Sequence, residues 1–160
     1  MIKYYLGGNE METVKLMNMC RIYDKNTNKV LVQERVKEWD GIAFPGGKVE
    51  TKESIVQSVK REVLEETGLE VDNLKICGVK DWYDNEKQER HLVILFNTST
   101  YSGNLLDETG EGKNYWVEES KIKDLKFADD FDTLLNVFNN DKLNEMIYIE
   151  NDGNWSVETY

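Results

Sequence analysis

The sequence is short of the features that divide a chain into several parts. It has a single proline, Pro45, and it contains no internal repeat, no low-complexity tract and no linker rich in Pro, Gly or Ser. We therefore predict one domain over residues 13–160, preceded by a polar, loosely ordered extension at residues 1–12. At 160 residues the chain is long enough to bury a hydrophobic core.

Long apolar runs, targeting signals and paired cysteines are missing as well. No apolar run approaches the roughly 18 residues that span a bilayer, and residues 1–10 lack the basic and apolar segments of a signal peptide. Cys20 and Cys77 stand in separate strand-like segments without metal-ligand spacing, so we expect two buried, reduced thiols. These features favour a cytoplasmic protein with no membrane partner.

Basic side chains are outnumbered by acidic ones. The 20 Lys and Arg residues stand against 31 Asp and Glu residues, which gives a net charge of −11. Residues 101–160 hold most of the excess, with 14 acidic and five basic side chains. Because nucleic-acid binders normally carry a basic face and anionic membranes attract basic segments, the composition argues against both kinds of partner.

Hydrophobic periodicity predicts an α/β fold, with helices packed against a mixed sheet. Strands are expected at residues 14–23, 29–33, 74–82, 91–98 and 115–117, with a short strand running into a glycine loop at 41–47. The turn at residues 151–153, Asn-Asp-Gly, predicts a hairpin between 146–149 and 155–157. Helices are expected at residues 54–67 and 131–138. Thr51 can cap the first of them, and Gly68 suits its C-terminal end.

Three glutamates share one face of the first predicted helix. At 100° per residue, Glu62, Glu65 and Glu66 fall within an arc of about 100°. An adjoining stripe that can anchor the helix to the sheet is formed by Val56, Val59 and Val63. Carboxylates at this density repel one another unless a cation lies among them, and hard oxygen ligands suit Mg²⁺ or Mn²⁺ bound to phosphates. The face is either a divalent-metal site acting on phosphates or a merely solvated acidic surface.

A longer motif decides between these interpretations. Gly47, five residues, Glu53, seven residues and then residues 61–69, REVLEETGL, reproduce GX5EX7REUXEEXGU, in which U is aliphatic. The seven fixed residue types give a chance match of order ~10⁻⁸ per window. The chain therefore resembles the Nudix hydrolases. The resemblance implies an α/β/α sandwich with a central mixed sheet, and Mg²⁺-dependent cleavage of a diphosphate linked to a moiety X.

The resemblance also implies roles for individual residues. The implied metal ligands are Gly46, through its carbonyl, and Glu62, Glu65 and Glu66. Glu62 or a neighbouring carboxylate such as Glu66 would orient or deprotonate the attacking water. Arg61 is implied to pair with a glutamate of the motif and to hold the helix carboxylates in place, and Glu53 is a candidate partner.

Segments outside the motif are similar to the MutT-type branch, and in particular to bacterial 8-oxo-dGTP diphosphatases. These segments are residues 13–24, 29–36, 44–50, 102–105 and 111–117. The similarity implies a small-molecule nucleotide substrate, a nucleoside triphosphate cleaved to monophosphate and pyrophosphate, with an oxidised purine such as 8-oxo-dGTP favoured. Glu111 resembles a downstream acidic residue that adds a metal ligand or base, and a solvated loop glutamate is the alternative.

Five further residues are candidates for substrate binding, each with a structural alternative. Arg35 contacts phosphate or base, or lies on the surface. Phe44 stacks on the base, or belongs to the core. Asn18 contacts the base edge, or is a hydrogen-bonded core amide. Asp129 and Asp130 donate to the base through a shared proton, or one of them caps the second helix, which is the favoured interpretation.

Other substrates and a non-catalytic role are the competing hypotheses. With ADP-ribose or a dinucleoside polyphosphate as substrate, the same diphosphate bond would be hydrolysed and only the moiety X would differ. Residues 82–86 lack the proline typical of the ADP-ribose branch. A nucleotide-sensing domain is disfavoured because every glutamate of the motif is present and no basic segment is appended. The sequence leaves a monomer and a homodimer equally open.

Overall fold

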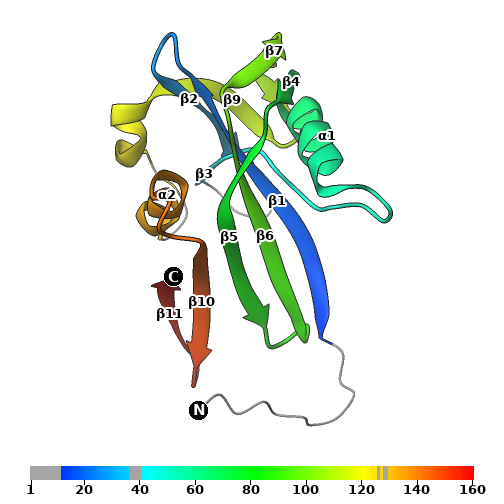
Figure 1. Ribbon diagram of the computed structural model, residues 1–160, viewed down its shortest axis with the longest axis vertical. Coiled ribbons are helices and arrows are strands. Elements are labelled where there is room, and N and C mark those ends of the chain that lie inside the picture. The colour runs from blue at the N-terminus through cyan, green and yellow to red at the C-terminus, as the bar shows by residue number, and fades with distance from the viewer. Residues whose placement is uncertain (1–11, 37–40, 126, 128–129) are drawn as a thin grey trace.

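The computed structural model describes residues 12–36, 41–125, 127 and 130–160 (Figure 1). Apart from Glu12, the expected N-terminal extension lies outside this part of the chain. The strands are β1 (Thr13–Asp24), β2 (Lys29–Arg35), β3 (Gly41–Ala43), β4 (Leu69–Asp72), β5 (Lys75–Asp84), β6 (Glu89–Thr98), β7 (Thr100–Gly103), β8 (Glu108–Thr109), β9 (Gly112–Glu118), β10 (Glu145–Asn151) and β11 (Asn154–Thr159). The helices are α1 (Ile55–Thr67), the 3₁₀ helix η1 (Glu119–Asp124) and α2 (Phe131–Asn139).

The main sheet is mixed, as the hydrophobic patterns predict. Its strands follow the order β11-β10-β5-β6-β1-β2-β9-β8, with β3 paired to β2. β1 runs parallel to β6 and β10 runs parallel to β5, while the other pairs are antiparallel. The apolar segment at β6 is central, as expected, because β1 and β5 flank it. The small β4–β7 sheet was not predicted, since four-residue strands carry almost no periodicity.

Two hydrophobic cores lie on opposite faces of this sheet. Along β1, Cys20 and Ile22 pack toward α1, whereas Met17 and Met19 pack toward the core that contains α2. Figure 1 shows the two helices on opposite sides of the strands. The period-2 alternation of side chains thus produces the predicted α/β/α sandwich. Within the described residues, no helix is long and apolar enough to cross a membrane.

Helix α1 differs in detail from its prediction. Its N-cap is Ser54, whose side chain accepts from the Gln57 N–H while the Gln57 side chain accepts from the Ser54 N–H. Thr51 lies three residues too early for this capping box, so the predicted Thr51 cap is wrong. Gly68 ends the helix in the left-handed conformation, with φ of 75°, as predicted. Val56 is 47% exposed and does not anchor the helix, because the buried stripe runs instead through Ser58, Val59, Val63, Glu66 and Thr67.

The C-terminal hairpin and α2 follow the prediction closely. β10 and β11 pair around Asp152 and Gly153, which have φ of 52° and 80° as a type I′ turn requires.

Both cysteines are free. Cys20 is fully buried as expected, but Cys77 is partly exposed, so that prediction is only half right.

A loop between β3 and α1 fills a gap in the main sheet. β1 and β2 pair only at Tyr23 with Val30 and at Asp24 with Lys29, and then they separate. The loop at residues 45–49 pairs with β1 in the gap, where the Asn18 N–H donates to the Gly47 carbonyl at 2.8 Å and the Cys20 N–H donates to the Pro45 carbonyl at 2.8 Å. A Cβ atom at Gly46 would lie 2.3 Å from the Asn18 carbonyl oxygen. This close approach requires glycine.

We expect Gly46→Ala to destabilise the protein by about 1–3 kcal/mol, because the added methyl forces the loop away from β1. Urea unfolding measures the loss. Gly153→Ala is the control: its φ of 80° is positive, as is that of Gly46, but a Cβ atom there meets nothing within 4 Å. Equal losses in the two variants would show that close packing of the loop on β1 is unimportant.

Candidate active site

A cavity of about 820 Å³ opens where β1 and β2 separate. Its wall is built from β1, the end of β2, the glycine loop, α1, β5 and the turn before β9. Eight residues predicted from the sequence line it: Asn18, Arg35, Phe44, Gly46, Glu62, Glu65, Glu66 and Glu111. The structure therefore brings most of the candidate site together around one hollow.

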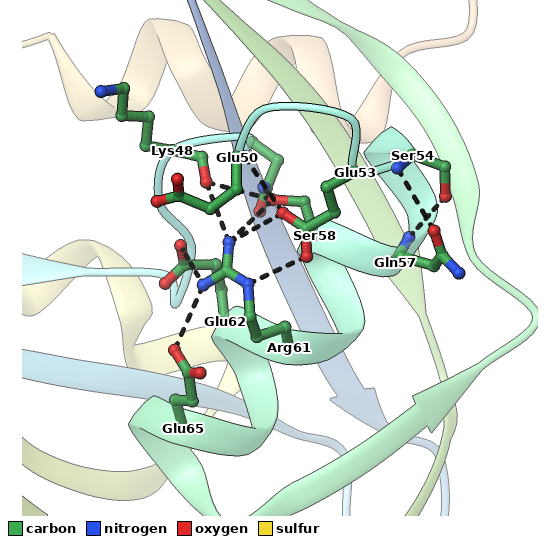
Figure 2. Close-up of polar contacts among 10 residues, drawn as sticks. Lys48, Glu50, Glu53, Ser54, Gln57, Ser58, Arg61, Glu62 and Glu65 are labelled. Atoms are coloured by element: carbon green, nitrogen blue, oxygen red, sulfur yellow. Dashed lines mark hydrogen bonds and ion pairs between the residues drawn. The ribbon is translucent and has the colours of Figure 1, made fainter.

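Arg61 connects three of the four glutamates of the motif (Figure 2). Its Nε and Nη2 donate to the two carboxylate oxygens of Glu53 at 2.9 and 3.0 Å, a bidentate pair. Nη1 donates to Glu62 at 2.9 Å and to Glu65 at 3.2 Å, and Nη2 also reaches the Lys48 carbonyl at 3.0 Å. These bonds lower the pKa of Glu53 to about 2 and raise the pKa of Arg61. Arg61 thus ties the loop before α1 to the carboxylate face of the helix.

Glu62 and Glu66 are the least exposed carboxylates of the motif. Glu66 is buried, and its Oε2 accepts from the Gly46 N–H at 3.0 Å. Burial raises the pKa of Glu66 to about 7, and the charges of Glu62 and Glu111 add to the effect. Burial also raises the pKa of Glu62, although the hydrogen bond from Arg61 opposes this. Glu65, in contrast, has a side chain that is 60% exposed. A positive charge in the cavity would therefore be favourable.

The donor set fits a hard divalent cation. Every predicted ligand offers oxygen, from the box carboxylates and the Gly46 carbonyl, and Mg²⁺ and Mn²⁺ prefer oxygen. A Cβ atom at Gly47 would lie 2.5 Å from the Glu62 carboxylate, so glycine leaves the space into which that side chain reaches. In the described part of the chain no three acidic, His or Cys side chains already converge on one point. Arg61 occupies oxygens of Glu62 and Glu65 that a cation would compete for.

Arg35 and Glu111 face the cavity together. The Arg35 Nη2 and the Glu111 Oε2 lie 3.7 Å apart, and their side chains are 15% and 33% exposed. Neither residue is a fully solvated surface side chain, which was the alternative interpretation of each. The pair adds a cation and a fourth carboxylate to the cavity formed by the glycine loop and α1.

Phe44 and Asn18 both have structural roles. Phe44 is 2% exposed, and its ring contacts those of Phe127, Phe131 and Phe138, so it belongs to the core while also lining the cavity. Asn18 is also buried, and its Nδ2 donates to the Ser58 Oγ at 2.9 Å. This bond ties β1 to α1. The Asn18 Oδ1 has no hydrogen-bond partner among the described residues.

Of the paired aspartates, the structure describes only Asp130. Asp129 lies outside the described residues. Asp130 occupies the N-cap position of α2 in a left-handed conformation, φ 61°, and its side chain makes no capping hydrogen bond. The favoured capping interpretation is therefore wrong for Asp130, since capping side chains need an extended backbone to reach the first-turn N–H groups.

Asp130 instead lines a second cavity of about 500 Å³. Lys80 and Trp82 line both cavities, so the two hollows adjoin. Lys80 was missed as a site residue, although its period-2 spacing from Trp82 on one strand places the two side chains on the same face. That spacing was the available signal.

Comparison with known proteins agrees with this architecture. A family model described as the NUDIX domain matches residues 17–137. The chain is 32% identical over 104 residues to an uncharacterized Nudix hydrolase, YvcI, of Bacillus subtilis, covering 63% of this chain and 65% of that protein. It is 40% identical over 86 residues to the oxidized purine nucleoside triphosphate hydrolase of Danio rerio, covering 53% and 52%. The chain thus spans between half and two thirds of the length of these relatives.

A solved structure resembles most of this chain. The crystal structure of the MutT protein of Bacillus halodurans matches with a TM-score of 0.74 and 26% identity, covering 91% of this chain and 97% of that one.

We expect Arg61→Gln to lower the free energy of unfolding by about 1–3 kcal/mol, because it leaves the largely buried carboxylates of Glu53 and Glu62 without their donor. Denaturant unfolding at neutral pH measures the change. Lys60→Gln on the same helix is the control, since its ion pair with Asp72 is exposed and should contribute less than about 1 kcal/mol. If both substitutions cost the same, Arg61 does not organise the site.

Proposed function

The chain belongs to the Nudix family of hydrolases, and we propose that it cleaves a nucleoside triphosphate to the monophosphate and pyrophosphate with Mg²⁺, or Mn²⁺, as cofactor. The observation that carries the proposal is the single cavity into which α1 and the glycine loop present Glu62, Glu65, Glu66 and the Gly46 backbone. A phosphate chain needs several positive charges to enter so acidic a hollow. Arg35 and the lysines Lys15, Lys48 and Lys80, which also line the cavity, would supply some of them, and the cation would supply the rest.

An oxidised purine nucleotide such as 8-oxo-dGTP is the proposed substrate. The relative from Danio rerio is named for hydrolysis of oxidised purine nucleoside triphosphates, and the aligned part of the chain is 40% identical to it. The net charge of −11 argues against a nucleic-acid polymer, and it is consistent with a small substrate bridged by metal in the cytoplasm. We place the protein there as a monomer or a homodimer.

The residues of the site would act on water and on the phosphate chain. When bound, Mg²⁺ would neutralise phosphate oxygens and stabilise the charge of the phosphoryl transition state. Glu62, Glu65 and Glu66 would hold the cation, joined by the Gly46 carbonyl and by Glu111. Glu62 or a neighbouring carboxylate would orient the attacking water and take its proton.

Two further groups would position these parts. Arg61, held on Glu53, would fix the side chains of Glu62 and Glu65 on the helix face. Arg35 would contact a phosphate oxygen. Water attacks phosphorus, the phosphoanhydride bond breaks, and pyrophosphate and the monophosphate separate.

A substrate panel tests the proposal. In the presence of Mg²⁺ we expect kcat/KM to be highest for 8-oxo-dGTP among 8-oxo-dGTP, dGTP, the other dNTPs, ADP-ribose and diadenosine polyphosphates, and we expect EDTA to abolish turnover. A preference for ADP-ribose or a dinucleoside polyphosphate would contradict the proposed substrate but would agree with the proposed metal-dependent hydrolysis of a diphosphate. Binding of nucleotides without hydrolysis of any of them would indicate a sensor instead.

We expect Glu62→Gln to lower kcat by about 10²–10⁴-fold while the thermal unfolding midpoint stays near that of the wild type, because the amide keeps the shape and loses the proton acceptor and the charge. Steady-state kinetics and a thermal melt measure the two effects. Glu70→Gln, an exposed acidic residue just beyond the same helix, should leave kcat unchanged. Near-wild-type turnover by Glu62→Gln would remove this carboxylate from the mechanism.

A further inference from the structure

The strand registers place Met17, Val93 and Lys80 in one row that leads away from the glycine loop, and this row forms the floor of the large cavity. Met17 on β1 lies beside Val93 on β6, which lies beside Lys80 on β5. Lys80 in turn lies beside Met146 on β10. Two strand spacings, about 10 Å, separate Met17 from Lys80. Because Met17, Val93 and Lys80 all line the large cavity, a nucleotide with its phosphates at the glycine loop would extend its base along this row.

Lys80 lies at the end of this floor that is farthest from the glycine loop, and its charged side chain is half-buried. Its Nζ lies 5.7 Å from the ring centre of Trp82 and 5.0 Å from that of Tyr148, so two aromatic rings flank the ammonium. Trp82 is itself fixed by stacking on His91, with ring centres 4.6 Å apart. The rings hold the lysine stem in place where the two cavities adjoin.

The ammonium carries hydrogen-bond donors that the described residues leave unused. No hydrogen bond or salt bridge joins Lys80 to a described residue. Burial lowers the pKa of Lys80, while the charge of Asp130 acts in the opposite direction. Asp81, next to it on β5 and facing the other side of the sheet, is buried as well, but it is hydrogen-bonded to Arg90. The contrast indicates that Lys80 is kept available for a ligand.

An ammonium offers three donors and no acceptor, so its partner must present an acceptor. Guanine-type purines present the O6 and N7 acceptors on one edge, whereas adenine places a donor amino group at position 6. 8-Oxoguanine keeps the O6 carbonyl. We propose that Lys80 is a specificity-determining residue that donates a hydrogen bond to the carbonyl oxygen of a 6-oxopurine base bound between Trp82, Tyr148 and the floor of the cavity. This inference rests on the proposed function and names the group that selects the base.

Product binding tests the inference separately from catalysis. Isothermal titration calorimetry with dGMP and dAMP should show tighter binding of dGMP to the wild-type protein. Lys80→Met keeps the aliphatic stem and removes the donors, so it should weaken dGMP binding about tenfold and leave dAMP binding nearly unchanged. In turnover with Mg²⁺, the ratio of kcat/KM for dGTP to that for dATP should fall by a similar factor, mainly through KM.

Two further variants serve as controls. Lys80→Arg, which retains charge and donors, should keep the preference for dGMP. Lys75→Met, an exposed lysine at the start of the same strand, should behave as the wild type. Circular dichroism establishes that each variant is folded, and if Lys80→Met is not, Lys80→Leu, which also has no donor, replaces it with the same expected loss.

The outcomes separate the inference from the proposed function. Equal weakening of dGMP and dAMP by Lys80→Met would assign Lys80 a structural role and overturn the inference, even if the protein hydrolyses nucleoside triphosphates. No preference for dGMP in the wild type would also overturn it. A preference that depends on Lys80 in a protein that hydrolyses no nucleotide would support the inference and contradict the proposed function.

Discussion

The backbone pairing between the glycine loop and β1 is the constraint on which the rest of the site depends. Where β1 and β2 separate, residues 45–49 take the place of a neighbouring strand, and Gly46 allows the contact because it has no side chain. The loop then leads into α1, so the carboxylates of that helix face the same hollow as the loop backbone. The Gly46 N–H completes the arrangement by binding Glu66, which fixes the buried end of the cluster.

Charge explains why the site has this composition. An acidic protein acting on an anionic substrate needs positive charge at the point of contact. Arg61 is committed to Glu53, Glu62 and Glu65, and Arg35 lies beside Glu111. The other basic residues that line the cavity are Lys15, Lys48 and Lys80. A divalent cation satisfies both the carboxylates and the phosphates. Of the described acidic residues beyond residue 100, Glu111 and Asp130 line the walls of these two cavities.

The features that local sequence determines were predictable, and those that depend on tertiary contacts were not. The spacing of Glu62, Glu65 and Glu66 gives their common face directly, and Asp152-Gly153 defines its hairpin. Val56 continues the apolar pattern of Val59 and Val63 along α1, yet the fold leaves it 47% exposed, which the local sequence does not indicate. The position of Lys80 beside Tyr148 depends on strand register, because β5 and β10 are distant in sequence and meet only in the folded sheet.

The central claim is that this cavity hydrolyses a phosphoanhydride bond of a nucleoside triphosphate. Phosphorus-31 NMR of the products formed from 8-oxo-dGTP or dGTP in the presence of Mg²⁺ tests it most directly. We predict signals of the nucleoside monophosphate and pyrophosphate, and none without the cation. Release of orthophosphate with a nucleoside diphosphate, or an unchanged triphosphate in the presence of Mg²⁺, would contradict the account.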